Sequence, residues 1–459
     1  MINGQNICLL NDSFPPQIDG VANAVRNYAE YIEQNHGHAL VVTPSFPDVV
    51  DEYPYPVLRY PSIDLRKQTG YMAGVPFSPE IANRLQEEKV SLLHSHCPIA
   101  STLLARELRE VVDAPLVITY HTKFDVDIAN IVRGRLLQEG SIKALVNNIS
   151  ACDEVWVVSQ GAGENLRSLG YEGEYVVMRN GVDMPLGKLP QDQVRLVTGG
   201  YDLPEGVPVY LFVGRMMWYK GLKIILDALA QLKMENMDFR MVFVGDGGDA
   251  SEIREYAENA GLMDRCIFTG AITGRDAIRA WYSRADLFLF PSTFDTNGLV
   301  VREAAASGLP SVLIQGSCAA EGVSDGQNGF LIQENTESMA QCLKKLHGNY
   351  SAMERVGNNA AKELYVTWET AVGEAFERYQ IVMDRYQCGY YPSRRKPMDG
   401  FLKAHGDLME GLGKIAATQD ELEEKLRSKH MEMESRRLKL QNELKEKRDE
   451  LWQKLERYL

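Results

Sequence analysis

Two acidic residues lie in a segment whose composition changes from strand to loop to helix. The apolar run 286–290 predicts a buried strand, the polar residues 291–297 predict a loop, and the positions that follow predict a helix. Asp295 lies in the loop and Glu303 on the helix. Because an ionised carboxylate accepts hydrogen bonds from hydroxyl groups, this pair could bind a sugar or a ribose without a metal ion.

The start of the same helix offers a place for an anion. Thr296 or Asn297 is expected to be the capping residue, and Gly298 and Leu299 come directly after it. The first turn of a helix has unpaired N–H groups and a partial positive charge, which suit a diphosphate. The alternative is an ordinary strand–loop–helix unit with solvated acids, because such units are frequent in doubly wound proteins.

A basic pair follows another expected strand. The run 209–213 is apolar, and Arg215 and Lys220 come soon after it. An Arg and a Lys placed in this way can reach one anion, the Arg with a planar fork of donors and the Lys with a point charge. Together they could offset the charge that develops on a leaving pyrophosphate.

Three histidines follow apolar runs. His121 comes after the run 115–120, so it is expected at the carboxyl end of a strand. His94 and His96 end another run and could share one face. No third ligand is evident beside them, so the pattern does not predict a metal site. These two residues could line a site or have a structural role, and the sequence leaves both alternatives open.

Two glycine-containing turns are further candidates. Gly20 follows the first strand, where it could let a phosphate or an acceptor approach the backbone or could be only a tight-turn residue. Residues 245–249 contain two Asp but lack the further acidic ligands of a metal cage, so they are interpreted as a turn. No Gly-x-Gly-x-x-Gly follows the first strand, which argues against a dehydrogenase.

Apolar runs of strand length alternate with helical patterns along the chain, which predicts parallel sheets covered by helices. Between the first two runs, Val25, Tyr28 and Ile32 recur at helical spacing, and this core-facing helix should stop at Gly37. The expected strands are 7–10, 40–43, 90–94, 116–120, 155–159, 175–178, 209–213, 241–245, 267–269, 287–290, 311–314 and 330–332. Ligands of open α/β sheets bind beyond the carboxyl ends of the strands.

These motifs resemble, in their order, those of the retaining glycosyltransferases of family four, which share the two-domain GT-B fold with glycogen synthase and sucrose synthase. The matching segments are 14–22, 120–122, 179–183, 214–222, 268–270 and 291–310. In the acid loop the family usually has Glu and a Phe-Gly pair, whereas this chain has Asp295 and Asn297-Gly298. Since Asp is one methylene shorter than Glu, the identity of the donor sugar stays open.

The resemblance implies transfer of a hexose from a nucleoside diphosphate sugar, UDP-glucose among them, with retention at the anomeric carbon. Arg215 and Lys220 would stabilise the departing diphosphate, Glu303 would hold the ribose, and Asp295 and His121 would orient the sugar. The residues expected to bind the donor are Gly20, Arg215, Lys220, Asp295, Thr296, Asn297, Gly298, Leu299 and Glu303. No metal and no cofactor besides the donor substrate is implied. The alternatives are a degenerate nucleotide-sugar-binding scaffold that oligomerises through its C-terminal helix, and a nucleotide-sugar 2-epimerase.

The GT-B pattern also implies the domain organisation. Residues 1–190 are predicted to form a Rossmann-like acceptor domain that a crossover helix at about 367–388 completes. Residues 191–366 are predicted to form the Rossmann-like donor domain, with a cleft between the two domains as the expected site. The stretch 184–207, rich in Pro and Gly, is interpreted as the linker, and residues 390–459 as a helical extension.

The acceptor stays open between a lipid and a soluble sugar. The segments 14–22 and 120–124 and the Asp-Thr-Asn-Gly form of the acid loop are similar to those of bacterial enzymes that glucosylate diacylglycerol. Residues 1–190, however, carry 15 Lys and Arg against 23 Asp and Glu, a net charge of −8, which does not favour an anionic lipid surface.

Composition narrows the class of protein. The chain has 459 residues, enough for two domains, and its net charge of −14 argues against a nucleic-acid partner. Its seven Cys lie far apart in the sequence, which predicts reduced thiols in a cytosolic protein. The start of the chain lacks the basic flank and apolar length of a signal peptide. A cytoplasmic protein is expected, membrane-associated if the acceptor is a lipid.

The last part of the chain has a different pattern. Residues 419–459 place Leu at spacings near three and four among balanced charges, which predicts a long amphipathic helix. Arg437 and Lys447 interrupt its heptads, so docking on the chain itself or on a partner is favoured over an ideal coiled coil. Self-association, membrane contact together with the basic residues 394–396, and a solvated single helix are the hypotheses.

Overall fold

The computed structural model describes most of the chain up to residue 391. The described residues are 4–17, 19–66, 70–124, 128 and 134–391. All the described residues except 77–79 belong to a first compact unit. The predicted helix at 419–459 therefore lies outside the described residues, and both large sheets belong to the first unit.

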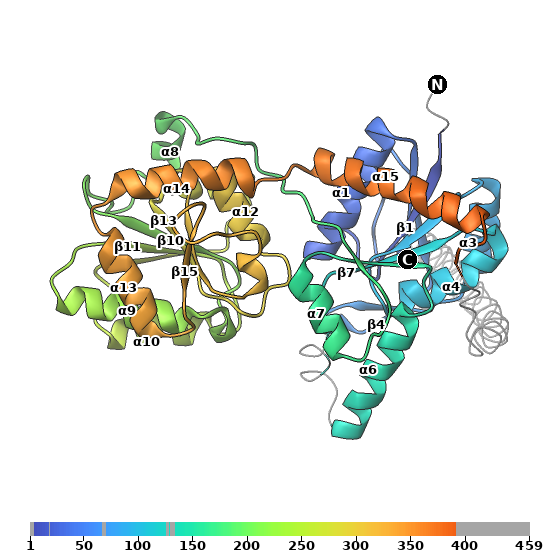
Figure 1. Ribbon diagram of the computed structural model, residues 1–459, viewed down its shortest axis with the longest axis horizontal. Helices are drawn as coiled ribbons and strands as arrows, with labels where there is room; N and C mark the ends of the chain where they lie inside the picture. Colours follow the sequence, from blue (N-terminus) through green and yellow to red (C-terminus); the bar gives the residue numbers. More distant parts are fainter. Residues whose placement is uncertain (1–3, 18, 67–69, 125–127, 129–133, 392–459) are drawn as a thin grey trace, which may run out of the picture. The chain divides into compact units, whose positions relative to one another are not determined.

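The first sheet has seven parallel strands in the order β3-β2-β1-β6-β7-β8-β9 (Figure 1). Its strands are β1 (Asn6–Leu10), β2 (His38–Pro44), β3 (Val57–Tyr60), β6 (Leu92–Ser95), β7 (Leu116–Tyr120), β8 (Glu154–Val157) and β9 (Val176–Val177). The helices along this part of the chain are α1 (Gly20–Asn35), α3 (Pro79–Glu87), α4 (Ala100–Val112), α6 (Arg135–Ile149) and α7 (Gln160–Ser168). A small antiparallel pair, β4 (Ser62–Asp64) and β5 (Met72–Gly74), lies outside the sheet. Strands extend from β1 in both directions, as in a doubly wound sheet.

The second sheet has six parallel strands in the order β12-β11-β10-β13-β14-β15. Its strands are β10 (Val209–Val213), β11 (Arg240–Val244), β12 (Cys266–Gly270), β13 (Leu287–Phe290), β14 (Ser311–Ile314) and β15 (Phe330–Ile332). The helices along this part of the chain are α8 (Gln191–Thr198), η1 (Trp218–Lys220), α9 (Leu222–Met234), α10 (Ala250–Asn259), α11 (Arg275–Arg284), α12 (Leu299–Ala306), η2 (Cys318–Ala320), α13 (Thr336–Leu346), α14 (Tyr350–Glu363) and α15 (Trp368–Gln387). This sheet extends from β10 in both directions, so the predicted fold of two doubly wound parallel sheets is confirmed.

The predicted strands agree best where the strand is buried on both faces. The expected runs 116–120, 209–213, 287–290, 311–314 and 330–332 have the same bounds as β7, β10, β13, β14 and β15. Such strands are continuous apolar runs because helices cover both faces of a parallel sheet. The strands β3, β4 and β5 were not predicted, because each is short and partly exposed.

The interpretation of 184–207 as an irregular linker is wrong in part, because α8 lies within it. The helix buries Val194 and Thr198. Its N-cap is Pro190 and its C-cap is Gly199. These residue types also occur at helix boundaries, so the Pro and Gly that suggested a loop in fact delimit a short helix.

Helix α15 packs with α1 on the first sheet, where Figure 1 shows the two helices side by side. The predicted core-facing positions Val25, Tyr28 and Ile32 of α1 are all buried. From α15, the guanidinium of Arg378 donates hydrogen bonds of 2.8 and 2.7 Å to the two carboxylate oxygens of Glu154. A bidentate pair to a buried carboxylate fixes orientation as well as position, so it holds the last described helix on the first sheet.

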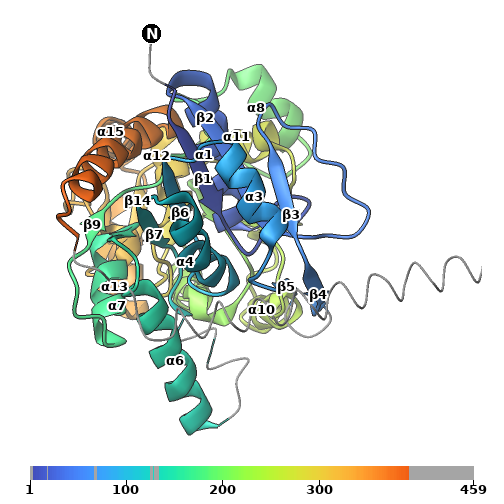
Figure 2. The ribbon, with the colours of Figure 1, turned by 90° about the vertical axis from the view of Figure 1, so that its right-hand side faces the viewer.

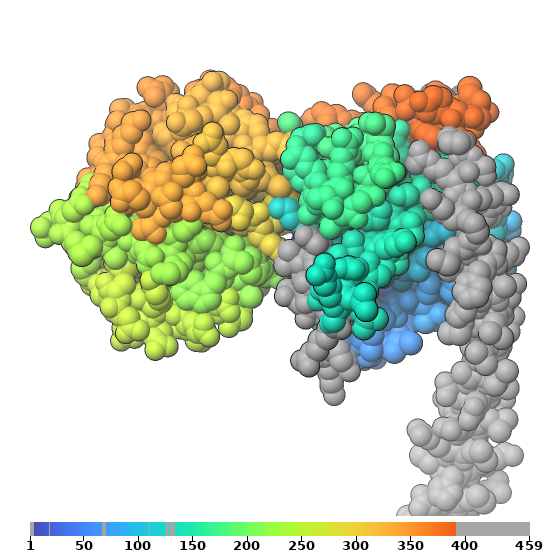
Figure 3. All heavy atoms as spheres, turned by 60° about the horizontal axis from the view of Figure 1, so that its bottom comes forward, coloured from blue at the N-terminus to red at the C-terminus, as the bar shows by residue number. Residues whose placement is uncertain are grey.

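The first turns of α6 stand out from the neighbouring elements, as Figures 1 and 2 both show. Leu136 and Leu137 there are 85% and 66% exposed, and the atoms of α6 lie at the surface in Figure 3. No helix in the described part of the chain combines the length and apolar character needed to cross a bilayer.

Candidate active site

The basic turn and the acid loop follow adjacent strands. Strands β10 and β13 pair in parallel, so the segments that leave their carboxyl ends start side by side. Gly221 shows how closely they approach: a Cβ at this position would lie 2.1 Å from the carbonyl oxygen of Pro291. Its φ of 78° is in the left-handed region, which a glycine adopts without strain. Any side chain here would push the two segments apart.

Lys220 and Asp295 form an ion pair at this junction. The Lys220 ammonium lies 2.8 and 2.7 Å from the two carboxylate oxygens of Asp295. The hydroxyl of Ser292 donates a further hydrogen bond of 2.7 Å to the same carboxylate. Lys220 is only 7% exposed. The sequence assigned these two side chains to different parts of a donor, whereas the structure joins them directly.

Arg215 differs from Lys220 in its surroundings. Its side chain is exposed. Within the described residues it has no hydrogen bond, ion pair or ring contact. The guanidinium is therefore available to an anion that binds beside the β10 turn.

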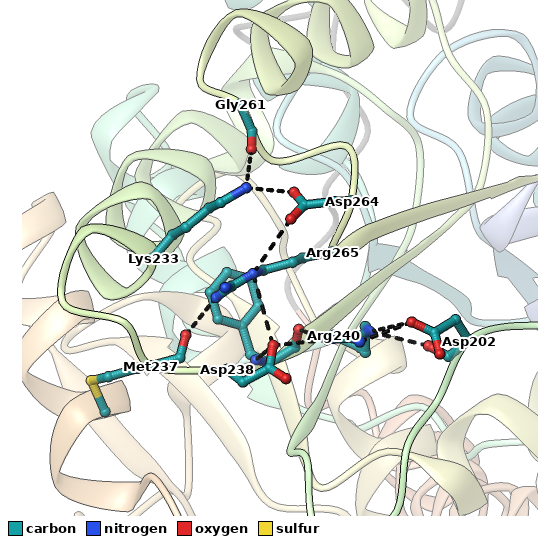
Figure 4. A network of polar contacts seen from close by, with 9 residues as sticks. Asp202, Lys233, Met237, Asp238, Arg240, Gly261, Asp264 and Arg265 are labelled. Atoms are coloured by element: carbon teal, nitrogen blue, oxygen red, sulfur yellow. Dashed lines mark hydrogen bonds and ion pairs between the residues drawn. The ribbon is translucent and has the colours of Figure 1, made fainter.

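A second basic cluster lies at the opposite ends of the strands. Figure 4 shows Lys233, Arg240 and Arg265 near the amino ends of β11 and β12. Each has carboxylate partners, with shortest distances of 2.6 Å for Lys233–Asp264, 2.8 Å for Arg240–Asp202 and 3.8 Å for Arg265–Asp238. Its cations are thus already paired with acids of the protein, unlike Arg215.

Helix α12 begins without a side-chain cap. The expectation that Thr296 or Asn297 caps it is wrong, because the N-cap is Gly298, with φ 60° and no side-chain capping bond. Thr296 instead donates a 2.6 Å hydrogen bond to the backbone carbonyl of His121. The Val301 amide donates to the carbonyl of Gly298, so the amides of Leu299 and Val300 are the ones left for another acceptor in this turn of the described chain.

The side chain of Asn297 is buried directly before this helix. It is 7% exposed, and neither its Nδ2 nor its Oδ1 has a hydrogen-bond partner among the described residues. A buried amide without partners is unfavourable in the protein alone. Uncapped helix amides and an unsatisfied side-chain amide therefore lie next to each other in the acid loop.

Glu303 lies one turn further along α12. Its Oε2 accepts a 3.0 Å hydrogen bond from the hydroxyl of Tyr282 on α11. Burial raises the pKa of the Glu303 carboxyl, while Tyr282 and Arg275 act in the opposite direction. The sequence identified Glu303 but gave no reason to choose Tyr282, which comes 21 residues earlier.

His121 follows β7, as predicted, and is 7% exposed. Burial lowers its pKa to about 3, so the imidazole is neutral at ordinary pH. Its Nε2 lies 3.0 Å from Nδ1 of His96. His94 is satisfied on both ring nitrogens, by the Tyr379 hydroxyl at 2.5 Å and by Thr119 at 2.7 Å.

These contacts give His94 a structural role and place His96 directly behind His121. The rings of His94 and His96 lie with centroids 4.0 Å apart, which agrees with their expected common face. Within the described residues, no group of three His, Cys, Asp or Glu side chains could hold a metal ion.

Gly20 is the first residue of α1. A Cβ there would meet no atom within 4 Å, so its surroundings do not require glycine. The next two amides of the turn donate to the Asp19 carboxylate at 2.8 and 2.7 Å. This helix start is therefore already capped by an acid, in contrast to that of α12.

Residues 245–249 form a turn that packs against the Arg215 segment. The Asp249 carboxylate accepts a 2.9 Å hydrogen bond from the backbone N–H of Trp218. A Cβ on Gly247 would lie 2.5 Å from the carbonyl oxygen of Met216. A pocket of about 400 Å³ adjoins this turn, with Met216, Asp246 and Phe268 among its lining residues.

The chain has two doubly wound parallel sheets. Beyond the strands of the second sheet lie an uncapped helix start, cations and carboxylates. This combination is that of the GT-B glycosyltransferases. The sequence model of glycosyl transferases group 1 matches residues 199–363, and that of glycosyltransferase family 4 matches residues 18–185. Together these matches span most of the chain, and the protein belongs to the family-four glycosyltransferases.

Curated relatives agree with this assignment. The chain is 26% identical to an alpha-monoglucosyldiacylglycerol synthase of Streptococcus pneumoniae over 67% of this chain and 70% of that protein. It is 27% identical to a GDP-mannose-dependent alpha-mannosyltransferase of Corynebacterium glutamicum over 83% of this chain and 90% of that protein.

Solved structures show the same fold. The complex of Anabaena Alr3699/HepE with UDP-glucose has a TM-score of 0.65 and 19% identity, and the match covers 82% of this chain and 99% of that one. Sucrose-phosphate synthase of Thermosynechococcus elongatus has a TM-score of 0.66 and 21% identity, with coverage of 83% and 99%.

Proposed function

We propose that the protein is a retaining, metal-independent glycosyltransferase. It moves a hexose from a nucleoside diphosphate sugar to a hydroxyl group of a lipid or of a soluble sugar. One observation carries this proposal: at the ends of β10 and β13, the Lys220–Asp295 pair lies in the same loop system as the uncapped start of α12. Cation, carboxylate and free amides are the groups that a sugar diphosphate needs.

The reaction exchanges one bond for another at the anomeric carbon. The bond from C1 to the phosphate oxygen breaks, and a bond from C1 to the acceptor oxygen forms on the same face. The acceptor proton passes to the leaving phosphate oxygen, so no nucleophile of the protein is needed. Lys220, Arg215 and the α12 amides offset the charge that builds up on the diphosphate, in place of a metal ion.

Lys220 would change partners when the donor binds. In the structure its counter-ion is Asp295. A diphosphate offers a stronger counter-charge, so Asp295 becomes available to accept hydrogen bonds from sugar hydroxyls. His121 is neutral, so it can hydrogen-bond the sugar without adding charge near the anomeric carbon.

Two kinds of acceptor have support among the relatives. The alpha-monoglucosyldiacylglycerol synthases of Streptococcus pneumoniae and Acholeplasma laidlawii favour a lipid, and the D-inositol 3-phosphate glycosyltransferases favour a soluble acceptor. Contact with a membrane surface and self-association through residues 419–459 remain hypotheses tied to this choice, as does a cytoplasmic location.

A panel of nucleotide sugars tests the proposal. UDP-glucose, UDP-galactose, GDP-mannose and ADP-glucose are compared by the shift they cause in the thermal unfolding midpoint, with EDTA present. The best binder is then incubated with diacylglycerol vesicles and with soluble sugars, and the anomeric configuration of the product is determined by NMR. Absence of binding by every donor, or a requirement for a divalent metal, would overturn the proposal.

Replacing Asn297 by leucine should separate stability from donor binding. Leucine has a similar shape but no polar atoms, so the ligand-free variant should be more stable than wild type by about 1 kcal/mol. The same change removes an amide from the donor site, so donor affinity should fall about tenfold. Urea denaturation measures the first effect and calorimetric titration with UDP-glucose the second.

Tyr210→Phe is the matched control for this variant. The Tyr210 hydroxyl is also buried without a partner among the described residues, but it lies on β10 away from the acid loop. Its removal should leave donor affinity at the wild-type value. A stabilised Asn297→Leu protein with unchanged donor affinity would show that Asn297 does not contact the donor.

A further inference from the structure

Tyr282 connects the buried face of α11 to the carboxylate of Glu303. Its side chain is fully buried, and its ring packs against Phe288 with centroids 5.7 Å apart. The ring is thus fixed by the core, and only the hydroxyl reaches α12, where it donates 3.0 Å to Oε2 of Glu303. A tyrosine held in this way offers a hydroxyl with little freedom to move.

The hydrogen bond uses only one of the two carboxylate oxygens. No other hydrogen bond to the Glu303 carboxylate exists among the described residues, so Oε1 is left for an external donor. The charged groups that act on this carboxyl are few. Arg275 of α11 favours its ionised form, and this Arg also pairs with Asp183.

We propose that Tyr282 is a positioning residue for the donor. Its hydroxyl holds Glu303 by Oε2 and leaves Oε1 to accept hydrogen bonds from the ribose hydroxyls. This inference rests on the proposed function, in which Glu303 binds the ribose. It adds a residue that touches no substrate and acts through Glu303.

Tyr282→Phe tests the inference because it removes one oxygen and keeps the ring. The dissociation constant for UDP-glucose should rise about fivefold at pH 7.5, the effect of one hydrogen bond of about 1 kcal/mol. If the donor panel selects GDP-mannose, that nucleotide sugar is the probe. In turnover assays KM for the donor should rise while kcat changes little, because the lost contact orients binding rather than the reacting bond.

The pH dependence distinguishes positioning from a general structural effect. Loss of the Tyr282 hydrogen bond removes an interaction that favours the ionised carboxyl, so the pKa of Glu303 should rise in the variant. Donor affinity falls as Glu303 becomes protonated, so the fall on the acid side should begin at a higher pH than in wild type. A merely structural role would weaken binding equally at every pH.

Tyr210→Phe again serves as the control, since it removes a buried hydroxyl from the same domain core. It should leave both the affinity and the pH profile unchanged. The inference would be overturned if Tyr282→Phe bound the donor with wild-type affinity and lost this affinity at the same acidic pH as wild type. The proposed function would remain intact. Failure of wild-type protein to bind any nucleotide sugar would overturn the proposed function itself.

Discussion

Lys220→Ala is expected to lower kcat for transfer by about a thousandfold, the upper range seen when one preorganised electrostatic contact to a developing charge is removed. The ammonium is 7% exposed and lies at the junction of β10 and β13, so water would replace it poorly. In the ligand-free variant Asp295 keeps only the hydrogen bond from Ser292. The unpaired carboxylate would also repel the diphosphate, so donor affinity should fall together with kcat.

Lys223→Ala is the control for this variant. Lys223 lies one turn further along the chain and pairs with Asp227 at 2.9 Å on the exposed face of α9. It should retain wild-type activity, because a surface ion pair contributes little. Circular dichroism and the unfolding midpoint show whether Lys220→Ala is folded. If it is not, Lys220→Met replaces it in the test, because methionine keeps the apolar part of the lysine side chain. Folded variants that retain full transfer would refute the role of Lys220.

Local pattern predicts the strand bounds and the positions of the candidate site residues beyond the strand ends. The bounds of β10 and β13 follow from apolar runs that are buried on both faces, and Arg215, Lys220, Asp295 and Glu303 follow from residue types beyond those runs. The fold class follows in the same way, because alternating strands and helices leave few alternatives to parallel sheets. Local pattern alone was sufficient for these features.

Features that depend on sheet order were not predictable. The Lys220–Asp295 pair exists because β13 lies beside β10, although two strands, β11 and β12, and the helices α9, α10 and α11 lie between them along the chain. The capping error at α12 has a similar origin. The hydroxyl of Thr296 donates its hydrogen bond to the carbonyl of His121, which is far away in the sequence. Tyr282 also gave no signal, since a buried tyrosine at helical spacing is ordinarily a core residue.

Glu303→Gln is expected to reduce kcat/KM for the donor by about a hundredfold while leaving the protein folded. The amide keeps the shape of the carboxyl and can still accept the Tyr282 hydrogen bond. It loses the charge that makes hydrogen bonds from ribose hydroxyls strong, and charge-assisted bonds are roughly twice as strong as neutral ones. Steady-state kinetics with varied donor measures the effect, and unaltered kcat/KM would remove Glu303 from the site.

Stability should change in the opposite direction in the same variant. Burial raises the pKa of Glu303, so the folded protein binds this proton more tightly than the unfolded chain does, and the ionised carboxyl destabilises the fold at neutral pH. Glu303→Gln should therefore unfold at a higher urea concentration than wild type at pH 7.5.

As the pH falls through the raised pKa, wild type becomes protonated and gains relative stability. The advantage of the variant should then vanish below the ordinary pKa of a glutamate, because the carboxyl is neutral in both states of the wild type. If the variant is less stable than wild type at neutral pH, the Glu303 carboxylate stabilises the folded protein. A loss of transfer activity could then not be ascribed to a lost contact between Glu303 and the donor.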